Sequence, residues 1–463
     1  MKTKTLPRCL SGKMNTSKHS FNILGDLKVE IEVTDNPFGL PLEVLFEMAA
    51  RINKKRSFLF VSKILGKHIP VHPHVSLLGG AALALLLHNR LQKLPATELD
   101  AMIQAFVEPD TAKGIYEALR VSPLEAEEPL LFIAFAETAT ALGHSMYSFF
   151  NGQTRFLHTT REVVAGMTPV LEFEEEHSHA TAHRCYARQA TFFDGTERVV
   201  LVDDEITTGN TSLNIIRDLH SKHPRSHYVI ASLLDWRSAS DKTKFVQLER
   251  ELGITIECLS LLQGQIRVSG GPIELERPKL DVSLGYHDIP ISRHYIGQYF
   301  TPVHDQTIIA ERPLHTECYM RDTGRFGLDT LRQRGLEEQL VCAGQYIGSL
   351  RTGNRTLCMG TGEFMYIPMR LASEMGEGVS YQSSTRSPIY PHRQQGYGIQ
   401  NAFSFDAMDC VGTLNYFYNV PADTYDELFV FIERAIGDEQ EASFVHACRL
   451  TGIPVIHFVY GNQ

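Results

Sequence analysis

Short apolar runs alternate with amphipathic segments along the first 262 residues of this chain. Val29, Ile31 and Val33 alternate with polar residues, a pattern typical of a half-exposed strand. Apolar runs between turn residues predict further strands, and apolar positions at helical spacing predict helices. The predicted strands are 57–62, 129–135, 198–202, 228–234 and 254–261, and the predicted helices are 41–52, 137–149, 210–219 and 239–252. Residues 75–88 predict a strand, a Gly-Gly turn and a buried helix.

Strands that alternate with helices indicate an α/β domain with a mainly parallel sheet, whose ligand lies at the carboxyl ends of the strands. We predict this domain at 21–262, after a flexible tail at 1–20. Residues 263–327 show little periodicity and are interpreted as a connector. A second α/β domain is predicted at 328–463, with strands at 356–359 and 455–460, a helix at 364–375 and a helix or strand at 428–435.

Composition narrows the class of protein. The chain has 463 residues, of which 43% are hydrophobic and 21% charged, as in ordinary globular proteins. Its net charge of −10 argues against a broad basic face for nucleic acid. The longest apolar run, 75–87, is too short to span a bilayer, and no signal peptide is visible. Eight cysteines without a C-x-x-C pair indicate reduced thiols. We therefore expect a cytoplasmic protein without nucleic-acid or membrane partners.

The most informative stretch is VVLVDDEITTGNT at 199–211. A buried strand leads to Asp203 and Asp204, and two adjacent carboxylates can accept hydrogen bonds from a vicinal diol. The turn that follows supplies backbone N–H groups and hydroxyls and opens a helix, whose N-terminus favours a phosphate. This turn consists of Thr207, Thr208, Gly209, Asn210 and Thr211. A ligand with a ribose diol beside a monophosphate suits both halves of the motif.

This pattern resembles the PRPP-binding signature of type I phosphoribosyltransferases (PRPP is 5-phosphoribosyl 1-diphosphate). The resemblance implies that Asp203 and Asp204 hold the ribose hydroxyls and act in catalysis, and that residues 207–211 bind the 5-phosphate. It also implies Mg²⁺ as cofactor. A Walker B strand would need a Walker A loop, which the sequence lacks, and a haloacid dehalogenase would need Asp-x-Asp. A simple helix cap at Asn210 would explain only one acid or one threonine.

Type I enzymes hold pyrophosphate with a strand–loop–helix upstream of this motif, and FAETATALG at 135–143 has that shape. The candidate pyrophosphate loop is Ala136, Glu137, Thr138, Ala139 and Thr140. Glu137 departs from the expected pattern, because an acid is unfavourable beside an anion. It could reach Mg²⁺, orient a substrate nitrogen or point away. A plain strand-to-helix turn is the alternative for the whole segment.

The family places a flexible hood over the active site between these two elements, here at 151–188. Arg161, His177 and His179 are the candidate residues for contact with departing pyrophosphate. A zinc site with His183 is disfavoured, because the spacing joins these histidines only on a strand and no cysteine completes the set. A solvated loop without chemistry is the alternative. Farther upstream, Lys63, Lys67 and His68 could meet phosphate or lie on a solvated helix face.

The sequence SSTRSP at 383–388 follows a strand-like segment, and its hydroxyls and guanidinium suit an anion. We predict that Thr385, Arg386 and Ser387 form an anion site of the C-terminal domain, close to the turn at 360–363. The alternative is an arginine paired with a structural acid. Combined with the transferase motif, these residues resemble bacterial two-domain proteins of tellurite-resistance gene clusters. In these proteins an orotate-phosphoribosyltransferase-like domain precedes a TRSP domain.

This resemblance implies a PRPP-dependent pentosyltransferase that makes or salvages a nucleotide-like metabolite. Transfer would be assisted by Mg²⁺ and would release pyrophosphate, and the acceptor is not identified. Two alternatives stay open: a PRPP-binding regulatory module without turnover, and a C-terminal domain that carries the main chemistry. A homodimer also stays open.

Overall fold

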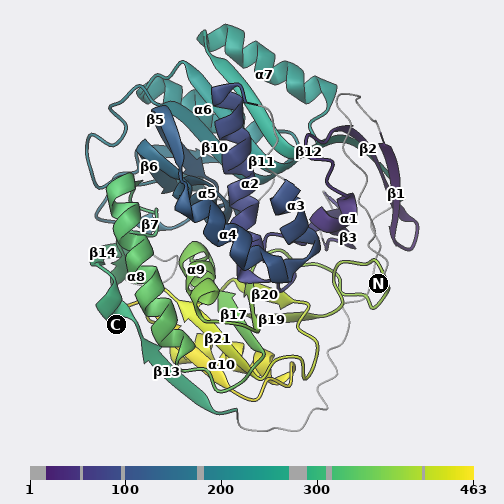
Figure 1. Ribbon diagram of the computed structural model, residues 1–463, viewed down its shortest axis with the longest axis vertical. Coiled ribbons are helices and arrows are strands. Elements are labelled where there is room, and N and C mark those ends of the chain that lie inside the picture. Colours follow the sequence, from purple (N-terminus) through teal and green to yellow (C-terminus); the bar gives the residue numbers. More distant parts are fainter. Residues whose placement is uncertain are drawn as a thin grey trace.

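The computed structural model describes residues 17–52, 56–94, 100–174, 182–270, 289–308, 315–408 and 412–462. Its two largest sheets come from the two halves of the chain and are joined by packed helices (Figure 1). The larger sheet is mixed and has eight described strands in the order β1-β2-β12-β11-β10-β5-β6-β16; its central strands are parallel, as predicted, and its edge strands are antiparallel. These are β1 (Ser17–Leu24), β2 (Leu27–Asp35), β12 (Thr255–Ser269), β11 (His227–Asp235), β10 (Arg198–Ile206), β5 (Leu124–Ala134), β6 (Phe150–His158) and β16 (Leu328–Asp329).

Strands β12, β11, β10, β5 and β6 are mutually parallel. From β5 the chain continues to β6 on one side, whereas β10, β11 and β12 follow on the other side. The strand order therefore reverses between β5 and β10. Ligands of open α/β sheets bind at such a reversal, outside the carboxyl ends of the strands.

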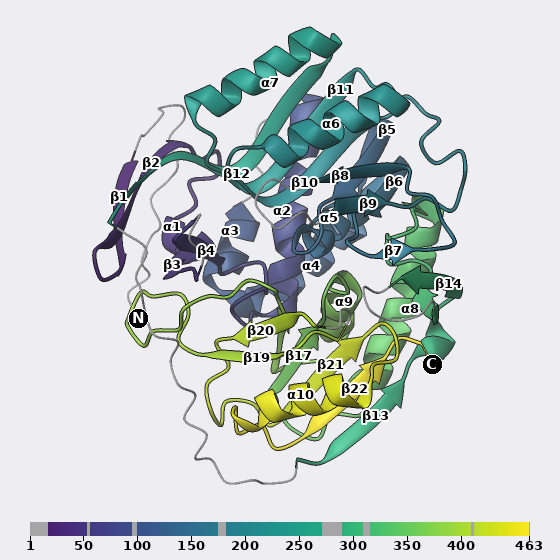
Figure 2. The same cartoon turned by 180° about the vertical axis from the view of Figure 1, so that it is seen from behind.

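Alternate residues of β5 enter different cores, as the twofold period of a strand requires. Leu130 and Phe132 pack with α2 (Pro73–Gln92) and α5 (Ala139–Ser148) on one face. Leu131 and Ile133 pack with α6 (Asn210–Lys222) and α7 (Ala239–Leu252) on the other. Figure 2 shows α6 and α7 on the side opposite to α2 and α5. The central strands β5, β10 and β11 are thus buried on both faces, which explains their continuous apolar runs.

The second sheet is parallel, in the order β13-β22-β21-β17-β18. Its strands are β13 (Ile291–Tyr295), β22 (Ile456–Tyr460), β21 (Glu427–Ile432), β17 (Thr356–Gly360) and β18 (Val379–Ser383). Helices α8 (Thr330–Gly348) and α9 (Tyr366–Glu374) cover the face toward the larger sheet. Helix α10 (Asp438–Arg449) and the hairpin β19 (Ala402–Asp406) and β20 (Leu414–Tyr418) cover the other face. One apolar core therefore runs from α2 and α5 through α9 into the second sheet.

Several sequence predictions differ from the structure. Strand β1 begins at Ser17 and so includes residues 17–20 of the predicted flexible tail. Residues 41–52, predicted as a helix, form only α1 (Leu42–Leu45) and then β3 (Phe46–Ala50). The strand predicted at 57–62 is β4 (Phe58–Ser62), but it pairs antiparallel with β3 in a small separate sheet. The strand, turn and helix predicted at 75–88 are a single helix, α2. A short apolar run cannot distinguish these cases by periodicity alone.

The connector predicted at 263–327 contains regular strands. Residues 263–269 extend β12 and pair with β2. Strand β13 forms an edge of the second sheet, whereas β14 (Pro302–Ile308) pairs with β15 (His315–Met320) and with β7 (Val163–Val164). The low periodicity of this stretch reflects partly exposed edge strands.

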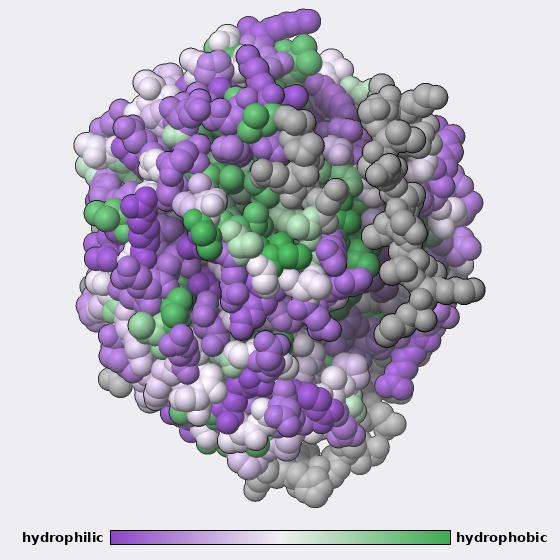
Figure 3. Space-filling view, in the orientation of Figure 1, coloured by the Kyte–Doolittle hydropathy of each residue, from purple (hydrophilic) through white to green (hydrophobic). Residues whose placement is uncertain are grey.

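The face in Figure 3 is mostly hydrophilic, and hydrophobic side chains gather near its centre over α2, α3 (Asp100–Val107) and α4 (Ala112–Val121). Within the described ranges, no helix is both long and apolar enough to cross a membrane.

The two glycines inside α2 have different roles. A Cβ added to Gly80 would lie 2.5 Å from Ser145 Cβ and 2.6 Å from the Met146 backbone nitrogen, so α2 and α5 approach closely here. At Gly79 the nearest atom to an added Cβ, a backbone oxygen of Ile64, is 3.7 Å away.

We therefore expect Gly80→Ala to lower the free energy of unfolding by about 1–3 kcal/mol through overpacking. The matched variant Gly79→Ala should be neutral or stabilising by up to about 1 kcal/mol, because alanine favours helix. Urea denaturation of both variants measures the difference. Equal stability of the two proteins would contradict this account of the packing between α2 and α5.

Candidate functional site

A cavity of about 650 Å³ lies at the point where the strand order reverses between β5 and β10. Its volume is typical of small-molecule sites. The residues that line it come from both halves of the chain. They are Arg51, Arg56, Phe58, Leu59, Lys67, Phe135, Ala136, Glu137, Thr138, Ala139, Arg161, His183, Asp203, Asp204, Glu205, Thr207, Thr208, Thr211, Trp236, Ile266, Val268, Thr385, Arg386 and Ser387.

Asp203 and Asp204 lie within β10, which continues to Ile206 instead of ending at Val202. Both are half-buried, and the Asp204 backbone N–H donates to Asp203 Oδ1 at 2.9 Å. Lys67 Nζ lies 4.0 Å from Asp204 Oδ2 and also donates to the Thr138 hydroxyl. Lys67 therefore connects the acidic pair with the loop after β5.

The turn after β10 leads directly into α6. Gly209 precedes α6 with φ +77°, a conformation that favours glycine, and a Cβ there would collide with Phe245. Thr207, Thr208 and Thr211 line the cavity. Asn210, in contrast, accepts a hydrogen bond from Lys244 at 3.4 Å. Of the five predicted turn residues, the three threonines are thus the ones that line the cavity.

The predicted pyrophosphate loop follows β5 directly, and its residues 136–139 line the cavity. The peptide bond between Ala136 and Glu137 is cis. The Ala136 backbone N–H donates to Thr159 Oγ1 at 2.8 Å. Thr140 does not line the cavity, because its hydroxyl donates to the Glu137 carbonyl at 2.9 Å and closes the first turn of α5.

Two ion pairs lie among the residues that line the cavity. Arg161 Nη1 lies 3.2 Å from Glu137 Oε2, which gives the unexpected acid of the loop a partner. Arg56 Nη2 lies 2.5 Å from Glu205 Oε1. Burial raises the pKa of Glu205 above its ordinary value, although Arg56 opposes this shift. Acidic and basic side chains thus meet in the lining of one cavity.

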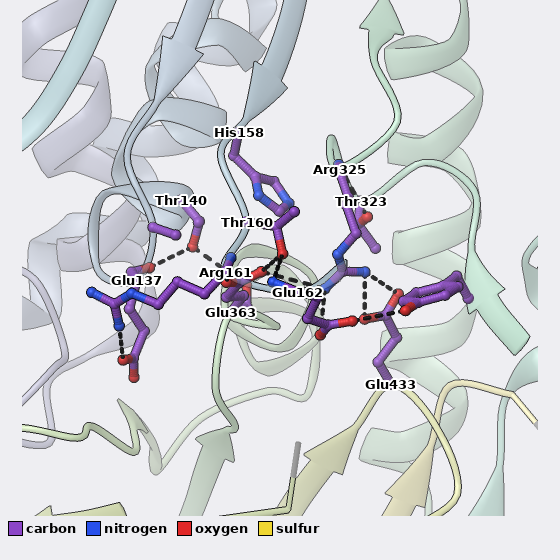
Figure 4. A network of polar contacts seen from close by, with 12 residues as sticks. Glu137, Thr140, His158, Thr160, Arg161, Glu162, Thr323, Arg325, Glu363 and Glu433 are labelled. Carbon is purple, nitrogen blue, oxygen red and sulfur yellow. Dashed lines mark hydrogen bonds and ion pairs between the residues drawn. The ribbon is translucent and has the colours of Figure 1, made fainter. Parts of the chain in front are cut away.

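Glu363, which follows β17 in the second half of the chain, holds the segment that carries Arg161. Its Oε2 accepts from the Thr160 hydroxyl at 2.6 Å, and its Oε1 accepts from the Arg161 backbone N–H at 2.8 Å. The Thr140 hydroxyl lies 3.4 Å from the Glu363 carbonyl (Figure 4). Burial raises the pKa of Glu363, against the attraction of Arg325. Glu363 therefore contacts the Arg161 segment through its buried carboxylate and the start of α5 through its backbone carbonyl.

A network of buried charges supports Glu363 (Figure 4). Arg325 Nη2 lies 3.8 Å from Glu363 Oε2, and Arg325 Nη1 donates to both Glu433 oxygens at 2.8 and 2.9 Å. Glu162 accepts from Arg434 at 2.7 Å. Burial would raise the pKa of Glu162, but Arg434 and Arg325 hold it below its ordinary value. These contacts tie the end of β21 to the segment after β6.

Thr385, Arg386 and Ser387 line the same cavity as the acidic pair. We expected them in a site belonging to the C-terminal domain, but the structure places them beside the transferase motif. Backbone hydrogen bonds hold this segment to both halves of the chain. Thr385 exchanges backbone hydrogen bonds with Tyr416 at 2.8 and 2.9 Å, and the Ser383 backbone N–H donates to the Gly66 carbonyl at 2.7 Å.

The hood predicted at 151–188 is wrong over its first part, because residues 151–158 belong to β6 and Phe156 and Leu157 are fully buried in the sheet. Farther along, β8 (Leu171–Glu174) and β9 (Ala182–Cys185) form a hairpin, and Leu171 packs in the core with α6. The predicted His177 and His179 lie outside the described residues. His183 lines the cavity, with Nδ1 3.0 Å from Thr159 Oγ1.

Several cavity residues were not predicted from the sequence, namely Arg51, Arg56, Glu205 and Trp236. Glu205 lies within the motif, at a position where the signature accepts any residue. The other three lie on separate segments without a motif. Three upstream residues, Lys63, Lys67 and His68, were candidates for contact with phosphate. Lys67 lines the cavity, whereas Lys63 lies 3.8 Å from Glu47 and His68 is buried.

The carboxylates of the cavity are the candidate ligands for a metal ion. Among the described residues, no group of three or more His, Cys, Asp or Glu side chains is placed to hold a metal ion. Mg²⁺ commonly uses one or two carboxylates together with substrate phosphates. The half-buried oxygens of Asp203 and Asp204 fit that donor set.

Two family models match the chain. The model described as phosphoribosyl transferase matches residues 45–265, and the model described as the TRSP domain C-terminal to that family matches residues 322–448. No curated protein matches.

Solved structures that resemble part of the chain include three phosphoribosyltransferases. One is adenine phosphoribosyltransferase from Trypanosoma brucei in complex with AMP, pyrophosphate and ribose-5-phosphate, with 15% identity, coverage of 34% of this chain and 66% of that chain, and a TM-score of 0.24. The enzyme from Leishmania tarentolae has 13% identity, 47% and 84% coverage and a TM-score of 0.26. A hypoxanthine phosphoribosyltransferase from Staphylococcus aureus has 11% identity, 38% and 70% coverage and a TM-score of 0.21.

The phosphoribosyl transferase match includes the acidic pair and the threonine turn. The chain therefore carries a phosphoribosyl transferase domain at residues 45–265, followed by the TRSP domain associated with that family at residues 322–448.

Proposed function

We propose that this protein transfers the 5-phosphoribosyl group of PRPP to a nucleophilic acceptor and releases pyrophosphate. One observation carries the proposal: the acidic pair, the threonine turn and the loop after β5 line a single cavity at the strand reversal. PRPP requires three features: carboxylates that accept hydrogen bonds from the ribose diol, a turn that binds the 5-phosphate, and a second loop that binds the pyrophosphate. The product would be a nucleotide-like metabolite.

In this proposal each group has a defined task. Asp203 and Asp204 accept hydrogen bonds from the ribose hydroxyls and stabilise positive charge that develops at C1. The threonine turn and the N-terminus of α6 bind the 5-phosphate. Backbone N–H groups of residues 136–139 hold the pyrophosphate, with Lys67 and Arg161 nearby. Mg²⁺, when bound at the acidic pair, would supply positive charge that neutralises the leaving pyrophosphate.

A PRPP-binding regulator would use the same cavity without turnover. Pyrophosphate release from PRPP and Mg²⁺, measured with a panel of acceptor bases, separates the two functions. Release that depends on the acceptor supports the transferase. Calorimetric binding of PRPP without release by any acceptor would favour the regulator, and absence of PRPP binding would reject both.

Asp204→Asn should weaken PRPP binding by roughly 1–3 kcal/mol, because the diol loses one charged hydrogen-bond acceptor. Calorimetry in the presence of Mg²⁺ measures the effect. Asp194→Asn, at an exposed position outside the cavity, is the control and should bind PRPP like the unmodified protein. Unchanged affinity in Asp204→Asn would contradict the assignment of the diol site.

Glu363→Gln should reduce PRPP affinity by on the order of tenfold, since one of the two oxygens that accept from the Thr160 hydroxyl and the Arg161 N–H is replaced by an NH₂ group that only donates. Glu433→Gln removes a charge from the same buried network, but Glu433 contacts Arg325 and Met320 instead of the loops. This control should lose thermal stability while keeping its PRPP affinity. Equal affinity losses in both variants would show that Glu363 has no specific positioning role.

A further inference from the structure

Glu137 and Arg161 form an ion pair inside the candidate site (Figure 4). Arg161 Nη1 lies 3.2 Å from Glu137 Oε2, and the two side chains are 18% and 7% exposed. Both residues line the cavity, and Glu137 belongs to the loop at 136–139. An anion held by the backbone of that loop would therefore lie next to this ion pair.

The backbone on each side of the ion pair is held in place. The Arg161 N–H donates to Glu363 Oε1 at 2.8 Å. The Glu137 carbonyl accepts from the Thr140 hydroxyl at 2.9 Å, and the peptide before it is held through the Ala136 N–H, which donates to Thr159. A ligand therefore changes this contact most readily by moving the two side chains.

A carboxylate in this loop has opposite effects on the empty and the occupied cavity. In the empty cavity Glu137 compensates the charge of Arg161, and a largely buried cation without a counter-ion is costly. In the occupied cavity the same carboxylate repels an anion on residues 136–139, because little water is present to screen the two charges. Both effects make anion binding weaker than it would be with a neutral side chain at position 137.

We propose that Glu137 competes with pyrophosphate for Arg161 and thereby weakens the binding of pyrophosphate to the loop after β5. Phosphate oxygens accept paired, charge-assisted hydrogen bonds from a guanidinium, as a carboxylate does. The Arg161 guanidinium therefore turns from Glu137 to bound pyrophosphate and returns to Glu137 when pyrophosphate leaves.

The consequence for turnover rests on the proposed transferase function. Product release limits the rate of many enzymes, and a competing carboxylate favours the release of pyrophosphate over its retention. The unexpected acid of the loop then has a use at the end of the reaction. The competition itself involves only pyrophosphate and is tested without turnover.

The test is a calorimetric titration of the full-length protein with inorganic pyrophosphate in the presence of Mg²⁺. Glu137→Gln should bind pyrophosphate on the order of tenfold more tightly than the unmodified protein. Asp194→Asn removes the same charge at an exposed position outside the cavity, and this control should bind like the unmodified protein. A Glu137 carboxylate that bound Mg²⁺, or that only oriented Arg161, would give the opposite result, because its removal would weaken binding.

A double-mutant cycle tests whether the gain acts through Arg161. Arg161→Gln should lose on the order of tenfold in pyrophosphate affinity. When Arg161→Gln is already present, Glu137→Gln should improve affinity by only about threefold, because the guanidinium for which the two anions compete is absent.

Thermal melting adds a measurement of the empty protein. Glu137→Gln should melt at a lower temperature than the unmodified protein, because Arg161 loses a counter-ion, and pyrophosphate should raise its melting temperature by more. Glu137→Ala is the second variant and should show the same gain in pyrophosphate affinity.

Four results would overturn the inference. They are unchanged or weaker pyrophosphate binding in the Glu137 variants, a full tenfold gain from Glu137→Gln in the absence of Arg161, no binding of pyrophosphate by any of these proteins, and failure of both Glu137 variants to fold. Binding of PRPP and its turnover are measured separately. Their absence in a protein that shows the expected pyrophosphate behaviour would reject the proposed function alone.

Discussion

The buried carboxylate of Glu363 is the contact on which the candidate site depends. It comes from the second sheet, yet it accepts hydrogen bonds from Thr160 and Arg161 of the first half of the chain. Arg161 in turn pairs with Glu137 in the loop after β5. Removal of one partner from a buried charge network is strongly destabilising, because an uncompensated charge is left behind. The network therefore favours one arrangement of the two halves, and with it the shape of the cavity.

The points at which the strand order reverses differ between the two sheets. In the larger sheet the reversal between β5 and β10 opens into the cavity. In the second sheet the order reverses between β17 and β21, and the residues that follow these strands include Glu363, Glu433 and Arg434. Their side chains occupy the place where an open α/β sheet commonly holds a ligand. The second sheet thus supports the cavity of the first with its own charged residues, and its TRSP segment forms part of the wall.

Much of the candidate site was predictable because its parts are local in sequence. A strand, two acids, a threonine turn and a helix occupy 199–211, so the order of residues already sets their geometry. The loop at 136–139 was found for the same reason. Arg51 and Trp236 carry no such signal, because each lies on its own segment and only chain folding brings it to the cavity. The role of Glu137 was also hidden, since its partner Arg161 lies 24 residues away.

The sequence by itself determined the alternation of strands and helices, the parallel strands of the first half and the motif for a ribose and a phosphate. These features depend on hydrophobic periodicity and on residues that are close together in the sequence. Only the tertiary structure decided that residues 75–88 form one helix, since the close contact of Gly80 with Ser145 involves a distant segment. It also decided that Thr385, Arg386 and Ser387 lie beside Asp203 and Asp204. Their shared position depends on the common apolar core and on the buried charge network between the two halves of the chain. Contacts between residues so far apart in the sequence leave no pattern in the local sequence.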